Sequence, residues 1–152
     1  MAFLINKRAD KHGYFRWHDS GDLYSDEYLE KVMTVINATP STRHWLPTRE
    51  KARIARYLRN NDKPSNLCIR LSATMFDSTA VKIDQCQTSG SHDKKPAIGY
   101  ACQAFRTFMD GTQLSRSEYS DLPEKHGLDI GHCGNCRACW DVEIEHVSYP
   151  RH

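Results

Sequence analysis

Residues 43–71 read RHWLPTREKARIARYLRNNDKPSNLCIRL, and this stretch decides the fold because it has the pattern strand, helix, strand. The short aromatic and apolar runs at 43–46 and 67–71 are typical of strands. Between them Thr48 is a candidate N-cap, and the polar run at 60–64 ends the predicted helix. This helix has small or apolar residues along one side, at Ala52, Ala55 and Leu58. A helix between two strands implies a crossover connection, so we expect the strands to be parallel.

The same alternation extends toward the N-terminus. Tyr14-Phe15-Arg16-Trp17 is a short aromatic stretch with strand propensity. Ser25 follows as a candidate N-cap, and Pro40 ends the helix that it begins. Apolar residues recur through that helix at a spacing that gives it one buried face: Leu29, Val32, Met33 and Ile36. The first half of the chain therefore predicts an α/β fold with a partial parallel sheet and flanking helices.

Beyond the third predicted strand the alternation stops. Residues 85–96 are polar and loop-like, and residues 142–152 form a tail without a clear pattern. Long irregular connections in a compact domain need a stabilising interaction other than apolar burial, and a bound metal ion would supply one. We expect two parts, an α/β part over 1–84 and a cysteine-rich, metal-stapled part over 85–152 that packs on it.

Length and composition set outer limits on the function. The chain has 152 residues, a formal net charge of +2 and 39% hydrophobic residues. The small charge removes the simplest argument for nonspecific nucleic-acid binding, and the apolar content is enough for a folded core. No apolar run approaches the roughly 20 residues of a membrane span, and residues 1–7 are too short an apolar stretch for a secretory signal. We expect a soluble intracellular protein that does not enter membranes.

Polar side chains follow each of the three predicted strands. They are His18, Asp19 and Asp22 after the first strand, Thr48, Arg49 and Glu50 after the second, and Ser72, Thr74 and Asp77 after the third. Ligands bind at the carboxyl ends of parallel strands, so these groups are expected at one edge of the sheet. His18, Asp19, Asp22 and Arg49 are the catalytic candidates, for proton transfer and for holding an anion. The alternative is that they form turns and helix caps.

Six cysteines are many for a chain of this length: Cys68, Cys86, Cys102, Cys133, Cys136 and Cys139. The last three have the spacing Cys-x-x-Cys-x-x-Cys, which brings three thiols to one centre from a turn-like backbone and hinders pairing among themselves. Tetrahedral thiolate sites suit a zinc ion or an iron–sulfur cluster such as 4Fe-4S, and the spacing does not choose between them. Free thiols are the alternative, and for Cys68, inside a predicted strand, a place in the core is the simpler interpretation.

The cysteine triplet needs a fourth ligand from elsewhere in the chain. Cys102 is the first candidate and Cys86 the alternative, and His132 or His92 come after them. A different candidate surface is the helix that carries four cations, Lys51, Arg53, Arg56 and Arg59. Two interpretations are open for these side chains: they contact a nucleic acid, or they form an ordinary solvent-exposed helix face.

Several stretches together resemble the gene-product-88-like family of bacteriophage proteins. They are residues 15–23, His44 to Glu50, Ile69 to Ala73, Cys133 to Trp140, and Val147 to His152. Longer members of that family look similar to half of a radical-SAM-type barrel with an upstream cysteine group, so the resemblance implies a half-barrel-like sheet. No cysteine precedes Cys68 in this sequence. We therefore expect no upstream cluster that would bind S-adenosylmethionine, and the C-terminal cysteines remain as the expected metal site.

Three functions remain open. The first is a phage-encoded metal-binding protein in the host cytoplasm that binds a host or phage macromolecule. The second is a metalloenzyme with its active site at the strand ends, on an undetermined substrate. The third is inhibition of a host defence or polymerase by direct binding. The sequence contains neither a phosphate-cradling glycine loop nor a nucleophile elbow, so it does not decide whether the protein is an enzyme.

Overall fold

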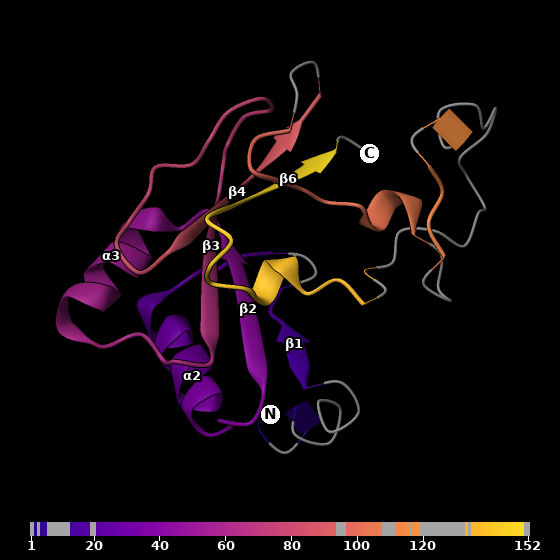
Figure 1. Ribbon diagram of the computed structural model, residues 1–152. Coiled ribbons are helices and arrows are strands. Elements are labelled where there is room, and N and C mark those ends of the chain that lie inside the picture. Colours follow the sequence, from indigo (N-terminus) through magenta and orange to yellow (C-terminus); the bar gives the residue numbers. More distant parts are fainter. Residues whose placement is uncertain are drawn as a thin grey trace.

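The computed structural model describes residues 2, 4–5, 13–18, 21–93, 97–107, 112–115, 117–118, 133 and 135–150. Its centre is a six-stranded sheet of half-barrel form in which every neighbouring pair of strands is parallel (Figure 1). The strands lie in the order β1 (Tyr14–Arg16), β2 (Arg43–Thr48), β3 (Leu67–Ser72), β4 (Gln87–His92), β6 (His146–Pro150) and β5 (Tyr100–Ala101). The α/β fold and the parallel sheet predicted from the sequence are confirmed.

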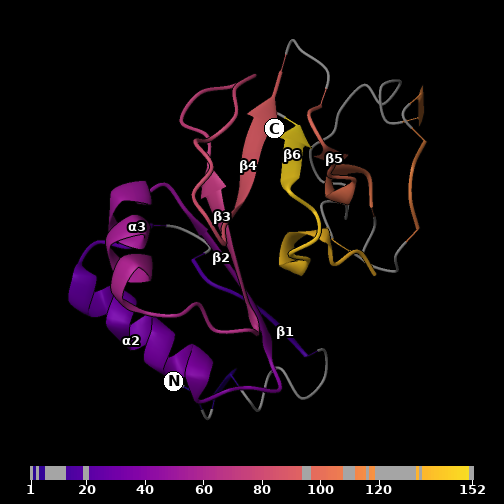
Figure 2. The same cartoon turned by 60° about the vertical axis from the view of Figure 1, so that its left-hand side comes forward.

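Helix α2 (Asp26–Asn37) forms as its sequence predicts. The Ser25 side chain caps it by accepting a hydrogen bond of 3.0 Å from the backbone N–H of Tyr28. The buried side chains of the helix are the predicted set, Leu29, Val32, Met33 and Ile36. Figures 1 and 2 show α2 and α3 on one side of the sheet and the C-terminal segment before β6 on the other.

Helix α3 (Lys51–Asn60) differs from its prediction at two points. Its N-cap is Glu50, because Thr48 is still the last residue of β2. The buried side chain of the helix is Ile54, whereas Ala52 is exposed. A branched aliphatic side chain removes more apolar surface from water than an alanine, so Ile54 decides which face turns to the sheet.

The expectation of a loop over 85–96 and an unpatterned tail over 142–152 is wrong, because these ranges contain the adjacent strands β4 and β6. β4 reads QTSGSH and has no apolar side chain by which to recognise it. Its backbone is paired on both sides, to β3 and to β6, and this pairing makes it a strand. Strands from both sides of residue 84 therefore share one sheet.

Close packing explains the glycine at the middle of β4. A Cβ atom at Gly90 would lie 2.7 Å from the backbone oxygen of Ser78. Ser78 belongs to the connection from β3 to β4, residues 73–86, which has no helix and runs against the strand. A side chain at position 90 would push this connection away.

The two faces of the sheet carry two separate cores. The larger core lies between the sheet and the helices and includes Leu46, Leu67, Ile69 and Leu71 from β2 and β3. The smaller core is formed by Trp45, Ala138, Cys139 and Val147. Successive residues of a strand point to opposite faces, so Trp45 lies on the second face while Leu46 lies on the first. Within the described ranges, no helix has the length and apolar character that crossing a membrane requires.

His44 joins β2 to α2 inside the larger core. Its Nδ1 accepts a hydrogen bond of 3.2 Å from Trp17 Nε1. Its Nε2 lies 2.8 Å from Thr39 Oγ1, whose hydroxyl donates to the backbone oxygen of Val35, so Nε2 is the donor. These contacts use both nitrogens of the neutral ring, and burial lowers the pKa of His44 to about 4.

We predict that His44 makes the protein acid-sensitive. A buried histidine with a lowered pKa stabilises the fold fully above its ordinary pKa of about 6.5, and this contribution is lost as the pH falls through about 4. The free energy of unfolding, from urea titrations at pH 7 and pH 4, should fall by about 3 kcal/mol through this residue. His44→Gln should reduce the fall by that amount. Equal losses in both proteins would show that His44 is not the group responsible.

Candidate functional site

The four cysteines of the predicted metal site line one small cavity. It measures about 10 Å³ and is bounded by Tyr100, Cys102, Ala104, Cys133, Cys136, Ala138, Cys139, Trp140 and Val147. Apart from the thiols and the Tyr100 hydroxyl, the side chains that face it are mainly apolar. The structure therefore brings Cys102, which is distant in sequence, to the cysteine triplet.

Each cysteine is placed by a local backbone feature. Cys102 follows β5, and its backbone N–H donates to the backbone oxygen of Ser148 in β6 over 2.8 Å. The backbone N–H of Cys136 donates to the oxygen of Cys133 over 2.9 Å, which closes a turn between the two thiols. Cys139 lies in a 3₁₀ turn, η2 (Ala138–Trp140). The spacing of two residues between cysteines is thus used to form tight turns.

Two tyrosines contact the thiols from the sheet. The hydroxyl of Tyr100 in β5 lies 3.2 Å from Cys136 Sγ, and the hydroxyl of Tyr149 in β6 lies 3.2 Å from Cys139 Sγ. The contact with Cys136 and burial raise the pKa of Tyr100 to about 12. Burial raises the pKa of Cys102 and raises that of Cys139 to about 12. Without a bound cation, Cys102 and Cys139 are neutral thiols at physiological pH.

The spacing of the thiols sets a limit on this site. Among the residues that the structure describes, no three His, Cys, Asp or Glu side chains are close enough together to hold one metal ion. Four thiols are suitable ligands for a zinc ion, and they surround one cavity. Their sulfur atoms are not close enough together to coordinate one ion. Metal binding at these four residues consequently remains a prediction.

A buried arginine of β3 holds the cysteine segment to the sheet. Arg70 is 0% exposed, and its five guanidinium N–H groups all donate to backbone oxygens. Nε donates to Cys139 over 2.9 Å, Nη2 to Ala138 and Asp141 over 2.7 and 2.8 Å, and Nη1 to Ile144 and Thr88 over 2.9 and 3.3 Å. None of these partners is a carboxylate, so the positive charge is solvated by carbonyl dipoles.

Aromatic rings cover the same segment from β1 and β2. The ring centroids of Trp45 and Trp140 are 5.2 Å apart in an edge-to-face arrangement, and those of Tyr14 and Trp140 are 5.6 Å apart. Trp140 Nε1 donates to the backbone oxygen of Phe15 over 3.0 Å. Arg137 lies over the ring of Tyr14, 4.8 Å from its centroid. These contacts hold η2 against the sheet.

The other candidate ligands lie apart from the cavity or outside the described residues. Cys86 is buried in the larger core, on the other face of the sheet. Cys68 is buried in β3, and its thiol is 3.6 Å from the Gln87 side-chain oxygen. His92 Nδ1 lies 2.9 Å from the Ser148 hydroxyl, and His132 is not among the described residues. Of the candidate fourth ligands that the structure describes, Cys102 is the one that lines the same cavity as the triplet.

The ends of β1, β2 and β3 meet around a second cavity, at the sheet edge where the sequence predicts the polar side chains to gather. This strand-end pocket measures about 410 Å³ and is lined by Arg16, His18, Gly21, Asp22, Pro47, Thr48, Arg49, Glu50 and Ser72. Three of the four catalytic candidates thus lie together. Asp19, the fourth, falls outside the described residues. Thr74 and Asp77 do not line this pocket, and Asp77 instead accepts a hydrogen bond of 2.8 Å from the backbone N–H of Asp93.

Asp22 is committed to shaping the pocket. Its Oδ1 accepts hydrogen bonds from the backbone N–H of Leu23 and from the Thr48 hydroxyl, and its Oδ2 accepts one of 2.7 Å from the backbone N–H of Arg49. These bonds tie the loop after β1 to the end of β2. The turn-forming interpretation therefore fits Asp22, whereas the Arg49 side chain is exposed and makes no described ion pair.

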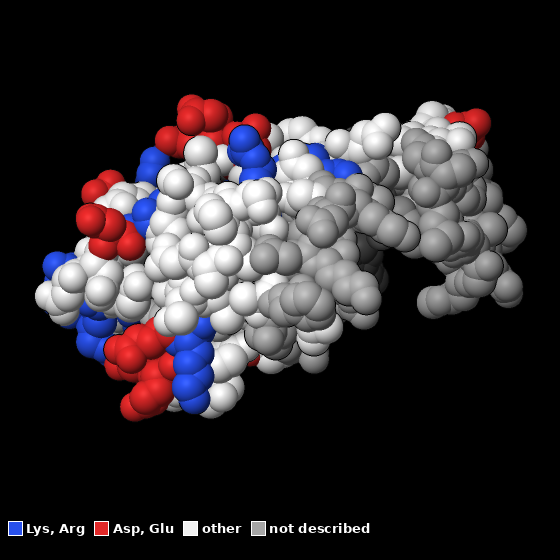
Figure 3. All heavy atoms as spheres, turned by 90° about the horizontal axis from the view of Figure 1, so that it is seen from below, with Lys and Arg blue, Asp and Glu red and all other residues white. Residues whose placement is uncertain are grey.

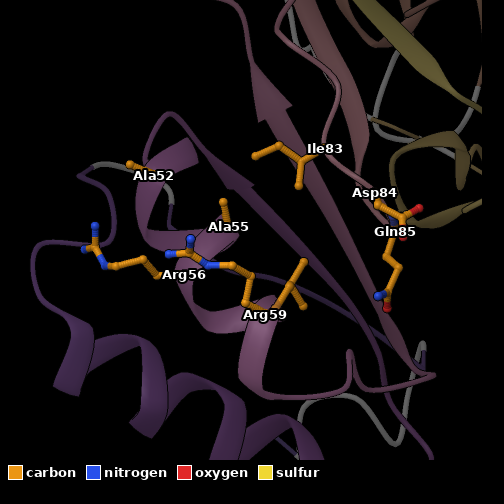
Figure 4. Close-up of a pocket in the computed structure, with 8 residues that line it drawn as sticks. Ala52, Ala55, Arg56, Arg59, Ile83, Asp84 and Gln85 are labelled. Atoms are coloured by element: carbon orange, nitrogen blue, oxygen red, sulfur yellow. The ribbon is translucent and has the colours of Figure 1, made fainter.

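The cations of α3 are partly neutralised. Arg53 and Arg56 both pair with the carboxylate of Asp26 on α2, and Arg53 Nε is also 4.0 Å from Glu50. Figure 3 shows acidic and basic atoms side by side on the face it presents. A groove of about 600 Å³ lies between α3 and residues 83–85, and Figure 4 shows Arg56 and Arg59 among its lining side chains.

Comparison with known proteins adds one finding. A family model described as Gene product 88 matches residues 3–142. No curated protein and no solved structure matches the chain.

We predict that replacing Arg70 lowers the free energy of unfolding, because this side chain holds the cysteine segment to the sheet. Arg70→Met removes five hydrogen bonds to backbone oxygens, and we expect a loss of about 4 kcal/mol in the free energy of unfolding. Arg70→Lys supplies fewer donors than there are acceptors, so its loss should be smaller, about 3 kcal/mol. Urea titration measures both. The matched control is Arg59→Met on the exposed side of α3, which should change stability by about 0.5 kcal/mol or less. A stable Arg70→Met protein would contradict this account.

Proposed function

The chain belongs to the gene product 88 family of bacteriophage proteins, and from this premise we propose that it is a metal-binding protein that acts on a macromolecule of the phage or its host. Cys102, Cys133, Cys136 and Cys139 would hold the metal, and a zinc ion is the first choice. The single observation that carries the proposal is that these four thiols, from segments far apart in sequence, line one cavity.

The size of the cavity favours zinc over a 4Fe-4S cluster. A volume of about 10 Å³ is close to that of one water-sized sphere. A single ion needs only that the surrounding sulfur atoms move inward, whereas a four-iron cluster needs the walls to move outward. Zinc is also the usual metal of closed tetrahedral cysteine sites.

The buried charge of Arg70 supports the same proposal. Four thiolates around a divalent ion carry a net negative charge, and a guanidinium beside them offsets it. Arg70 donates to the backbone oxygen of Cys139 itself, so its charge lies next to the cysteine segment. When bound, the metal would supply a structural cross-link, and Arg70 would orient the segment that carries three of its ligands.

A cross-link here would close a large loop. Roughly thirty residues separate Cys102 from Cys133, and fixing the ends of such a loop is worth about 3 to 4 kcal/mol in the chain-entropy model. Among the described residues the smaller core has four buried members, so it gains most from such a cross-link.

For the partner we propose a protein in the host cytoplasm rather than a nucleic acid. Arg53 and Arg56 share the Asp26 carboxylate, and Arg53 also lies 4.0 Å from Glu50, so the positive charge of α3 is reduced and gives a weak basis for phosphate contacts. The connection from β3 to β4 instead exposes Met75, Phe76 and Val81, at 71%, 52% and 66% of their surface. Exposed apolar side chains grouped along one segment favour a protein contact.

A metalloenzyme that uses the strand-end pocket is the second candidate. Its support is that the pocket forms where three parallel strands end and that His18, Asp22 and Arg49 line it. The use of Asp22 in loop hydrogen bonds weakens the proton-transfer part of this alternative.

Metal content tests the proposal directly. Protein purified without oxygen should contain about one zinc per chain, by elemental analysis, and show no visible colour. Cys136→Ala should lose the metal, and Cys86→Ala, the matched control from the larger core, should keep it. Stripping the metal with a chelator should lower the free energy of unfolding by about 3 kcal/mol. Iron in the purified protein, with a brown absorption near 400 nm, would show that the cysteines hold an iron–sulfur cluster and not zinc. Metal-free protein, or equal metal content in the two variants, would overturn the four-thiol site.

A further inference from the structure

We propose that the strand-end pocket is a binding site for a small ligand that carries a phosphate group. The proposal rests on the residues of this pocket alone and is independent of the metal. The pocket lies where β1, β2 and β3 end, and in open α/β sheets the carboxyl ends of parallel strands are where ligands bind. Its volume of about 410 Å³ is within the range of small-molecule sites.

Two of the residues that line the pocket are arginines, Arg16 and Arg49, which supply positive charge. The side chain of Arg49 is exposed and has no described ion-pair partner. Arg16 lies over the Trp45 ring, 4.8 Å from its centroid, which holds the guanidinium at the end of β1. Arginine is the side chain best suited to phosphate, because its planar fork can donate two parallel hydrogen bonds.

His18 supplies a hydrogen-bonding group to the lining of the pocket. Its Nε2 is 3.1 Å from the Tyr28 hydroxyl, and its Nδ1 is buried without a partner among the described residues. A buried polar atom that lacks a partner is costly unless a ligand or water satisfies it. His18 also has a left-handed backbone, with φ of 56°, which is uncommon outside glycine.

The start of α3 adds a third favourable element. Thr48, Arg49 and Glu50, which lead into the helix, all line the pocket, and Glu50 makes no side-chain cap hydrogen bond. The N-terminus of a ten-residue helix carries partial positive charge, which favours an anion close to it.

The two carboxylates in the pocket have partners of their own. Asp22 accepts three hydrogen bonds from Leu23, Thr48 and Arg49, and Glu50 is 4.0 Å from Arg53 Nε. Neutral donors thus stabilise the Asp22 carboxylate in place, and Arg53 partly offsets the charge of Glu50. Neither carboxylate makes a described ion pair with Arg49, so the Arg49 side chain is left for the ligand. A neutral ligand would use none of the charge at this site, and for that reason we assign it to a phosphate-bearing one.

The test uses inorganic pyrophosphate and adenosine monophosphate as probes, with adenosine as the phosphate-free comparison. Titrations of the full chain at fixed ionic strength, followed by tryptophan fluorescence, report on the pocket because Trp45 lies beneath Arg16. We expect saturable binding of both phosphate probes at millimolar or lower concentration and at least about tenfold weaker binding of adenosine.

Two variants and one control locate the site. Arg49→Gln should weaken binding of the phosphate probes by about tenfold, which corresponds to the loss of one charged pair. His18→Asn keeps a residue type that tolerates the left-handed backbone and should weaken binding several-fold. Arg59→Gln, an exposed arginine outside the pocket, should bind as the unaltered protein does. Circular dichroism and thermal unfolding confirm that each variant is folded.

Three outcomes would overturn the proposal. They are the absence of saturable binding by either phosphate probe up to about 10 mM, adenosine binding as tight as the monophosphate, and unchanged binding in the folded Arg49→Gln protein. None of these outcomes depends on metal content, so the phosphate site and the cysteine site succeed or fail separately.

Discussion

The burial of one guanidinium group organises the C-terminal half of the molecule. Arg70 is fully inaccessible and gives all five of its N–H groups to backbone oxygens, four of which belong to residues 138–144. A buried cation without those acceptors would cost several kcal/mol, so the irregular segment and the arginine each require the other. Residues 138–144 make few regular backbone hydrogen bonds with one another. The Arg70 side chain supplies donors for their backbone oxygens instead. The cysteines, the 3₁₀ turn and the approach to β6 all follow from this attachment.

The position of Arg70 depends in turn on the two-residue period of β3. Leu67, Ile69 and Leu71 face the larger core, and Cys68 and Arg70 alternate with them on the other face. A shift of one residue in the pairing of β3 would put the guanidinium among the helices and three aliphatic side chains against the cysteine segment. Pairing on both sides, to β2 and to β4, excludes such a shift. The parallel sheet therefore does more than support the site, because its register selects which face becomes polar.

Strands β1 to β3 and helices α2 and α3 are predictable from the sequence because their side chains carry the pattern of burial. β4 is not, since Gln87-Thr88-Ser89-Gly90-Ser91-His92 has no apolar residue and becomes a strand through the partners on either side. The grouping of the cysteines is half predictable, because turn spacing is local whereas the approach of Cys102 depends on the parallel pairing of β5 with β6. Arg70 could have been noticed as one charge in an apolar strand. Four of its five acceptors lie about seventy positions later and have no signal in the sequence, since any residue type has a backbone oxygen.

The strand order explains why this fold can hold two separate polar sites. β6, the last strand in the chain, lies between β4 and β5, and the segment that leads into it returns across the face of the sheet opposite to the helices. That return brings Cys139 under Trp45 and beside Cys102, and it occupies the face on which a helix would otherwise pack. The carboxyl ends of β1, β2 and β3 are left clear of this segment and open to solvent at the pocket that contains His18 and Arg49. The cysteine cavity is thus closed and suited to a structural role, while the strand-end pocket is open and suited to exchange of a ligand.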